Sequence, residues 1–130
     1  MPVRPLALAA LLALAACDTP ADLASIRLDA LSHDPAALVG TWDLVSVTSS
    51  GFGGPVETVA VAPGTETYTF RADGTFEHVR EGVAQATGTY EVEGASLRLG
   101  DGARWFGIDG DRLYFDFRPM DGPLQAYRRR

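Results

Sequence analysis

The stretch TETYTFRADGTFEHVRE, residues 65–81, contains two alternating runs on either side of a short turn at Asp73-Gly74. Apolar or aromatic side chains occupy every second position in the centre of each run, which is the pattern of a half-buried β-strand. Asp-Gly is favoured in tight hairpins because both central residues of such a turn need a positive φ. The stretch therefore predicts an antiparallel β-hairpin.

The same pattern continues from Gly40 to the end of the chain, where short runs are separated by turns that contain glycine. Gly51–Pro55 is expected to be a longer loop, and Val56–Ala62 behind it is a candidate for an additional irregular strand. Strands are expected over Trp42–Ser49, Thr65–Arg71, Thr75–Glu81, Thr87–Val92, Ser96–Leu99, Arg104–Ile108, Arg112–Phe117 and Leu124–Arg128. Such strands, joined up and down with no edge left open, predict an all-β fold: a small up-and-down antiparallel β-barrel of about eight strands. A two-sheet sandwich is the alternative.

The N-terminus has the parts of a secretory signal peptide: Arg4, then the Leu/Ala run Leu6–Ala16, then Cys17. This run is well below the ~20 apolar residues that a membrane-spanning helix needs. Leu14-Ala15-Ala16-Cys17 resembles the bacterial lipobox. The resemblance implies that Cys17 carries a lipid anchor once the signal peptide is removed. Cys17 is also the only cysteine, so no intrachain disulfide can form.

The chain is accordingly expected to have three parts. Between the anchor and the barrel, Pro20 predicts the start of a short helix that ends near Leu31, and Asp34-Pro35 predicts a single helical turn through Leu38. The parts are a lipoprotein signal peptide (residues 1–16), the lipidated cysteine with its tether (17–37) and the barrel domain (38–130).

The charge of the chain argues against a nucleic-acid partner. The sequence has 11 Lys and Arg residues against 17 Asp and Glu residues, which gives a net charge of −6. Its only basic run is Arg128–Arg130 at the very end, whereas binding of phosphates needs clustered positive charge. We expect a monomer whose contacts are with a membrane, through the anchor, and with a small hydrophobic ligand.

Three runs resemble the lipocalin and lipocalin-like families, including bacterial lipocalin-like lipoproteins. They are Leu38–Ser46 with its Gly40-Thr41-Trp42 motif, Tyr68–Phe76, and Gly88–Val92. The resemblance implies that Trp42 closes one end of the barrel and that an Arg of the last strand lies over its ring. Arg128 is the candidate, because Leu124, Ala126 and Arg128 share one face at period two. Gly40, Trp42 and Arg128 are thus expected to be structural residues.

The strand registers predict which side chains face the lumen and could bind a ligand. On Thr75–Glu81, Phe76, His78 and Arg80 share one face, so a His and an Arg would point inward beside the aromatic residues. We favour a position at the rim, where both reach water, over the alternative that they hold the polar end of a ligand. The candidate ligand-binding residues are Tyr68, Phe70, Phe76, His78, Arg80, Tyr90, Phe115 and Phe117.

No pattern in the sequence indicates catalysis, a cofactor or a metal. His33 and His78 are the only histidines, and no His-Glu-x-x-His or Cys-x-x-Cys spacing is present. No Gly-x-Ser-x-Gly motif surrounds a serine. Asp109-Gly110-Asp111 lacks the later oxygen ligands of a calcium loop and fits a hairpin turn. We therefore expect that the protein is not an enzyme.

The expected function is a lipid-anchored lipocalin-like protein that binds a small apolar or amphipathic ligand in the cell envelope. The alternative is an envelope protein-interaction module without a ligand cavity, like the small barrels that inhibit periplasmic proteases. An open apolar lumen would favour the first, and a filled lumen the second. The anchor is expected to hold the domain on a bacterial membrane facing the periplasm. Whether the inner or the outer membrane holds it stays open, because the retention signal that Asp18 resembles does not operate in all bacteria.

Overall fold

The computed structural model describes residues 26–50, 55–100 and 102–130 of the 130-residue chain. The predicted signal peptide, the lipidation of Cys17 and the start of the predicted tether helix lie outside these residues, and so remain predictions. Within the described ranges, no helix has the length and apolar character needed to cross a bilayer.

The described residues form nine strands, one short α-helix and two 3-10 turns. The helical elements are η2 (Leu28–Ala30), α1 (Pro35–Leu38) and η3 (Arg118–Met120). The strands are β1 (Gly40–Ser50), β2 (Val56–Ala60), β3 (Glu66–Phe70), β4 (Thr75–Arg80), β5 (Val83–Glu93), β6 (Ser96–Leu99), β7 (Gly102–Asp109), β8 (Arg112–Asp116) and β9 (Leu124–Arg129).

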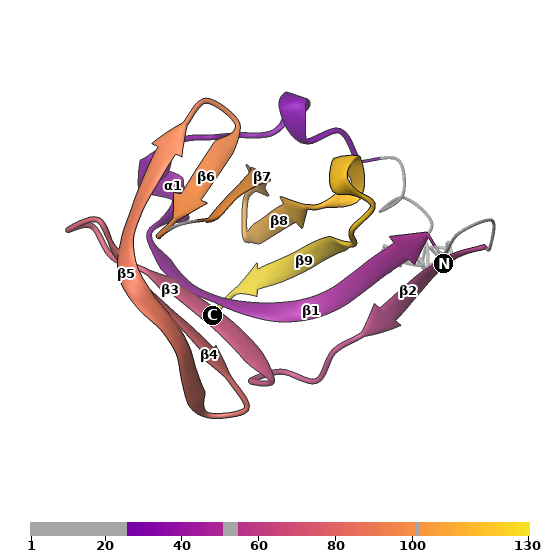
Figure 1. The fold of residues 1–130 in the computed structure, drawn as a ribbon, viewed down its shortest axis with the longest axis horizontal. Helices are drawn as coiled ribbons and strands as arrows, with labels where there is room; N and C mark the ends of the chain where they lie inside the picture. Colours follow the sequence, from indigo (N-terminus) through magenta and orange to yellow (C-terminus); the bar gives the residue numbers. More distant parts are fainter. Residues whose placement is uncertain (1–25, 51–54, 101) are drawn as a thin grey trace, which may run out of the picture.

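The strands close into an antiparallel barrel (Figure 1). The sheet runs from β1 through β3 to β9 in chain order, and β9 pairs back onto β1, so that every strand except β2 belongs to the closed ring of eight. β2 pairs only with the second half of β1, from Ser46 to Ser50. The predicted all-β, eight-stranded up-and-down barrel is therefore confirmed, and the sandwich is excluded by the β1–β9 pairing.

The hairpin at residues 65–81 forms as predicted, with a different turn geometry at its tip. The carbonyl of Arg71 accepts from the amide of Gly74 at 3.1 Å, and Gly74 alone in this turn has a positive φ, of 87°. This is a three-residue loop, in which only the last position needs glycine, rather than a two-residue loop with two positive φ angles. The carboxylate of Asp73 accepts hydrogen bonds from both the amide and the hydroxyl of Thr75.

The segment before the barrel is mostly extended. Residues 26–31 contain only the 3-10 turn η2, so the helix predicted to end near Leu31 does not continue through them. Ser32 forms a β-bridge with Ile108 of β7, and this fixes the segment along the outer face of the barrel. The turn predicted at Asp34-Pro35 is confirmed as α1, with the Asp34 carboxylate accepting from the amide of Ala36 at 2.9 Å.

Two apolar clusters hold the domain together, one on each side of the sheet. The inner cluster fills the barrel and contains the predicted inward residues Tyr68, Phe70, Phe76 and Phe115. The outer cluster lies between the N-terminal segment and the strands beneath it. Its buried members are Leu28, Tyr114, Leu124 and Ala126.

Candidate functional site

One end of the barrel, here called the Trp42 end, is closed by Trp42, Leu38 and Arg129. Trp42 is fully buried, and its indole N–H donates to the carbonyl of Leu38 at 2.8 Å. The guanidinium of Arg129 lies 4.2 Å from the centre of the indole ring and donates to the carbonyls of Val39 and Ala37. A cation over the face of tryptophan is a favourable arrangement. This end is therefore structural, and α1 covers it.

The prediction that Arg128 lies over Trp42 is wrong. Arg128 points outward and forms a long ion pair with Asp111, and its side chain is 61% exposed. The residues that share its face, Leu124 and Ala126, are buried in the outer cluster under the N-terminal segment. Leu124, Ala126 and Arg128 do share one face of the strand, as predicted, but that face is the outer one. The next residue, Arg129, faces inward and lies over the Trp42 ring.

Gly40 belongs to the closure for a steric reason. Its φ is 141°, and a Cβ at this position would lie 2.7 Å from the Nη1 atom of Arg129. Both the backbone angle and the close approach require glycine. The Gly-x-Trp motif thus supplies the ring that Arg129 covers and the space that its guanidinium occupies.

The other end, here called the Arg104 end, contains four ionisable side chains: Glu66, His78, Arg80 and Arg104. Tyr68 lies among them, with its ring stacked on His78 at 4.1 Å and its hydroxyl accepting from Arg104 at 3.1 Å. Burial raises the pKa of the Tyr68 hydroxyl, although the charge of Arg104 and its hydrogen bond oppose that rise. The phenol therefore stays neutral at physiological pH.

Arg104 is the most unusual side chain of this end. Its guanidinium lies over three aromatic rings, at 5.0 Å from Phe115, 5.4 Å from Phe117 and 5.7 Å from Tyr68. Its Nε atom is buried and has no hydrogen-bond partner in the described structure. Buried N–H groups are nearly always paired, so an unpaired nitrogen on a cation needs an explanation.

Glu66, His78 and Arg80 form a chain of contacts beside Tyr68. The Glu66 carboxylate lies 2.7 Å from Nε2 of His78 and accepts from Arg80 at 3.4 Å. Glu66 and His78 are largely buried, whereas the Arg80 side chain is 55% exposed. The favoured rim position holds for Arg80 alone, since His78 faces the interior and packs on Tyr68.

The other predicted lining residues are aromatic rings inside the barrel. Phe115 and the half-buried Phe117 lie against Arg104. Phe70 contacts both Phe76 and Tyr90, at 6.5 Å and 5.2 Å between ring centres, and it also stacks on Tyr68 at 5.9 Å. The predicted ligand-binding rings therefore pack on one another in one continuous cluster inside the barrel.

The middle of the lumen is filled by rings that meet across it. Tyr68 of β3 lies edge-on to Phe115 of β8 and to Tyr127 of β9, at 5.3 Å and 5.6 Å between ring centres, although β3 pairs with neither strand. Burial also raises the pKa of the Tyr127 hydroxyl, which donates to the side-chain oxygen of Gln125 at 2.9 Å. These rings occupy the centre of the lumen, so an occupant would have to bind near an end.

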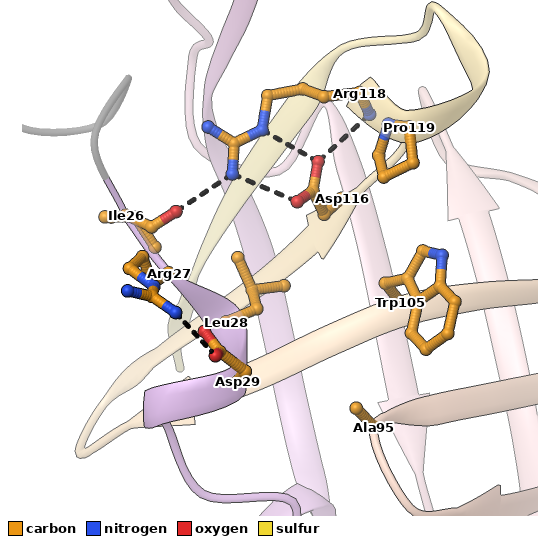
Figure 2. Close-up of a pocket in the computed structure, with 9 residues that line it drawn as sticks. All are labelled: Ile26, Arg27, Leu28, Asp29, Ala95, Trp105, Asp116, Arg118 and Pro119. Carbon is orange, nitrogen blue, oxygen red and sulfur yellow. Dashed lines mark hydrogen bonds and ion pairs between the residues drawn. The ribbon is translucent and has the colours of Figure 1, made fainter.

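A groove of about 350 Å³ lies outside the barrel, between the N-terminal segment and the outer face of the sheet (Figure 2). Figure 2 shows Arg118 at its edge, held by two hydrogen bonds from its guanidinium to Asp116 and one to the carbonyl of Ile26. The lining residues are Ile26, Arg27, Leu28, Asp29, Ala95, Trp105, Asp116, Arg118 and Pro119.

Sequence reasoning missed Glu66 and Arg104, although a signal was present for both. Glu66 shares a face with Tyr68, and Arg104 shares a face with Phe106, at the spacing of two that defines the inner side of a strand. Across the described ranges, no three His, Cys, Asp or Glu side chains gather as a metal site. No protein-family model matches the chain, and a search of the curated proteins finds no match.

Proposed function

We propose that this protein is a lipid-anchored, lipocalin-like binding protein of the bacterial envelope, and that the Arg104 end of its barrel receives the anionic head of a small amphipathic molecule. The observation that carries the proposal is the buried Nε of Arg104, which has no hydrogen-bond partner among the described residues. The proposed activity is binding without catalysis.

A negatively charged ligand would satisfy the unpaired N–H of Arg104. Leaving a buried donor unpaired costs roughly 1–3 kcal/mol, and more when the donor is charged. A carboxylate or phosphate oxygen at Nε forms a charge-assisted hydrogen bond, which is stronger than a neutral one. The rings of Phe115, Phe117 and Tyr68 already hold the guanidinium in place, so the ligand need not order it.

The apolar part of the ligand would cover side chains at the same end. Phe117, Val47 and Val61 are only partly buried there and pack against the inner cluster. Since aromatic rings fill the middle of the lumen, the proposed ligand would lie close to the Arg104 end, next to Phe117. A compact amphipathic anion suits this arrangement better than a molecule that must thread the whole barrel.

Titration of the protein with dansyl-undecanoic acid tests the proposal by fluorescence. Wild type is expected to bind this probe, and Arg104→Met is expected to bind it at least about tenfold more weakly, as for the loss of a hydrogen bond to a charged group. Arg128→Ala is the matched control, because it removes an exposed arginine from the outer face. Equal affinity of wild type and Arg104→Met, with both folded, would rule out Arg104 as the head-group site.

The filled lumen favours a second candidate, a module that binds another envelope protein through its outer surface. The ring contacts between Tyr68, Phe115 and Tyr127 support it, since they leave little space at the centre of the barrel. Native mass spectrometry of protein purified from its own host separates the two candidates. A bound small molecule supports the first, whereas a ligand-free protein that also fails to bind the probe favours the second.

A further inference from the structure

The outer groove has an apolar surface that the barrel does not need for its own packing. Trp105 of β7 is 46% exposed, and Met120 of η3 is 62% exposed. Pro119, directly before Met120, lines the groove together with Trp105, Ala95 and Ile26. Figure 2 shows the Trp105 indole at one wall and Ile26 and Leu28 at the other. Large exposed apolar side chains gathered in one place mark an interaction surface.

The charged groups at the groove form two acid–base pairs. Arg27 pairs with Asp29 at 3.1 Å, and Arg118 pairs with Asp116 at 2.8 Å. Burial acts to raise the pKa of Asp116, but the hydrogen bonds and charge of Arg118 outweigh it and hold that pKa below its ordinary value. These two pairs carry no net charge, so covering the groove would bury each charge together with its partner.

The position of the groove along the chain indicates its occupant. Ile26 lines the groove and follows Cys17 by nine residues in the sequence. Nine extended residues span at most about 30 Å. A lipid on Cys17 would thus keep the groove within about 30 Å of the bilayer surface, where the high effective concentration favours even weak apolar contacts.

We propose that this outer face, made by Ile26, Trp105 and Pro119, rests on the surface of the bilayer that holds the anchor. Tryptophan suits that boundary because its ring is apolar and its N–H is polar, and it is enriched at membrane interfaces. The inference rests on the lipid anchor in the proposed function but is independent of any ligand in the barrel. The anchor alone would only tether the domain, whereas this contact would also fix its orientation on the membrane.

The two tryptophans make the contact measurable. Trp42 is fully buried in the barrel and Trp105 is the exposed one, so quenching from the membrane should act on Trp105. Lipidated protein from host membranes is reconstituted into phosphatidylcholine vesicles, with or without brominated phosphatidylcholine. We expect brominated lipid to quench at least about half of the Trp105 emission, defined as the difference between wild type and Trp105→Phe.

A matched control places an indole elsewhere on the barrel. Glu77 lies on β4, four strands from β8 around the ring, and its pairing with Arg71 is exposed. Glu77→Trp in the Trp105→Phe background should be quenched by acrylamide in water and little by brominated lipid. Equal brominated-lipid quenching at positions 105 and 77 would overturn the orientation.

Separate readouts distinguish a failure of the docking from a failure of the anchor. Vesicle flotation reports the anchor, and brominated-lipid quenching reports the docking. Protein that floats with vesicles while Trp105 remains open to acrylamide and is not quenched by lipid overturns the docked face alone. Wild-type protein that does not float overturns the anchor and with it the inference. Trp105 shielded from acrylamide without quenching by lipid would assign the groove to a protein partner and also overturn the proposal.

Discussion

The guanidinium of Arg129 lies over the indole of Trp42, 4.2 Å from its ring centre, and joins the last strand of the barrel to the first. The same group donates to the carbonyls of Val39 and Ala37, in the chain that leads into β1. One side chain therefore satisfies two backbone acceptors and covers the ring at the seam where β1 and β9 pair. This seam is the pairing that turns an open sheet into a barrel.

The first prediction concerns this pair. Arg129→Ala and Trp42→Leu should each lower the free energy of unfolding, and the double variant should lose less than the sum, with a coupling of about 0.5–2 kcal/mol. Urea unfolding of the four proteins measures the coupling. Arg128→Ala is the control and should change stability little, because its side chain is exposed. Additive losses would contradict a contribution of the stacked pair to stability.

A second prediction concerns the space beside Arg129. Gly40→Ala should destabilise the barrel by roughly 1–3 kcal/mol, because the methyl group meets Arg129 and the φ of 141° is unfavourable for alanine. Gly64→Ala is a matched control, since its φ of 82° is also unfavourable but a Cβ there has no atom within 4 Å. The part of this destabilisation that comes from contact with Arg129 should be smaller when Gly40→Ala is made in an Arg129→Ala background. If Gly40→Ala costs no more than Gly64→Ala, the close approach does not matter.

A third prediction concerns the acid stability of the N-terminal segment. The pKa of Asp116 lies below its ordinary value of 3.8 when folded, so its interaction with Arg118 stabilises the fold above about pH 4 and is lost as pH falls through the folded pKa. Asp116→Asn should therefore be about 1–3 kcal/mol less stable than wild type at pH 7, and this difference should narrow as pH falls below about 4.

Unfolding curves at several pH values measure this difference. Asp29→Asn provides the control, because its pairing with Arg27 is exposed and such pairs contribute little. A gap between wild type and Asp116→Asn that stays constant down to pH 3 would assign the effect to packing rather than to the charge of Asp116.

The barrel and its inner face could be predicted from the alternation of apolar and polar residues, because successive side chains of a strand point to opposite faces of the sheet. Tyr68, Phe70 and Phe76 were placed inside on this basis, and all three are buried. On β9 the same rule failed, since Leu124 and Ala126 are apolar yet lie outside the barrel. They are buried by the N-terminal segment, a tertiary contact that no local pattern in β9 reveals.

The Arg104 end was only partly predictable for a related reason. His78 and Arg80 were recognised as inward-facing, but Glu66, the residue that pairs with both, was not singled out. Arg104 starts a predicted strand, where a charged residue ordinarily reaches solvent. Its alternation with Phe106 places it on the inner face, but the rings of β3 and β8 that lie against it are brought there only by closure of the barrel.

A fourth prediction concerns attachment to the membrane. Cys17→Ser should abolish both lipidation and membrane association and leave the barrel folded, because Cys17 is the only cysteine and lies outside the barrel domain. Cell fractionation with metabolic palmitate labelling tests the first two effects, and circular dichroism tests the third. A variant that is still labelled and still sediments with membranes would disprove the anchor.

The last prediction uses the charge of Glu66 to test the sign of the ligand at the Arg104 end. Arg104 donates to the Tyr68 hydroxyl, and the Tyr68 ring stacks on His78, which contacts Glu66. A head group held by Arg104 would therefore lie near the charge of Glu66. Glu66→Gln keeps an acceptor for His78 but removes the negative charge. It should tighten binding of dansyl-undecanoic acid by about 0.5–1.5 kcal/mol, the size of a screened interaction between partly buried charges.

The matching alcohol, with the same chain and no charge, should bind wild type and Glu66→Gln equally. Glu77→Gln is the control protein, because it removes an exposed acid from the outer face and should leave both affinities unchanged. If Glu66→Gln instead leaves the affinity for the anionic probe unchanged while the fold is intact, the head group lies away from this cluster. Opposite effects of Glu66→Gln and Arg104→Met on the anion alone would assign the head group to the space that these two side chains share.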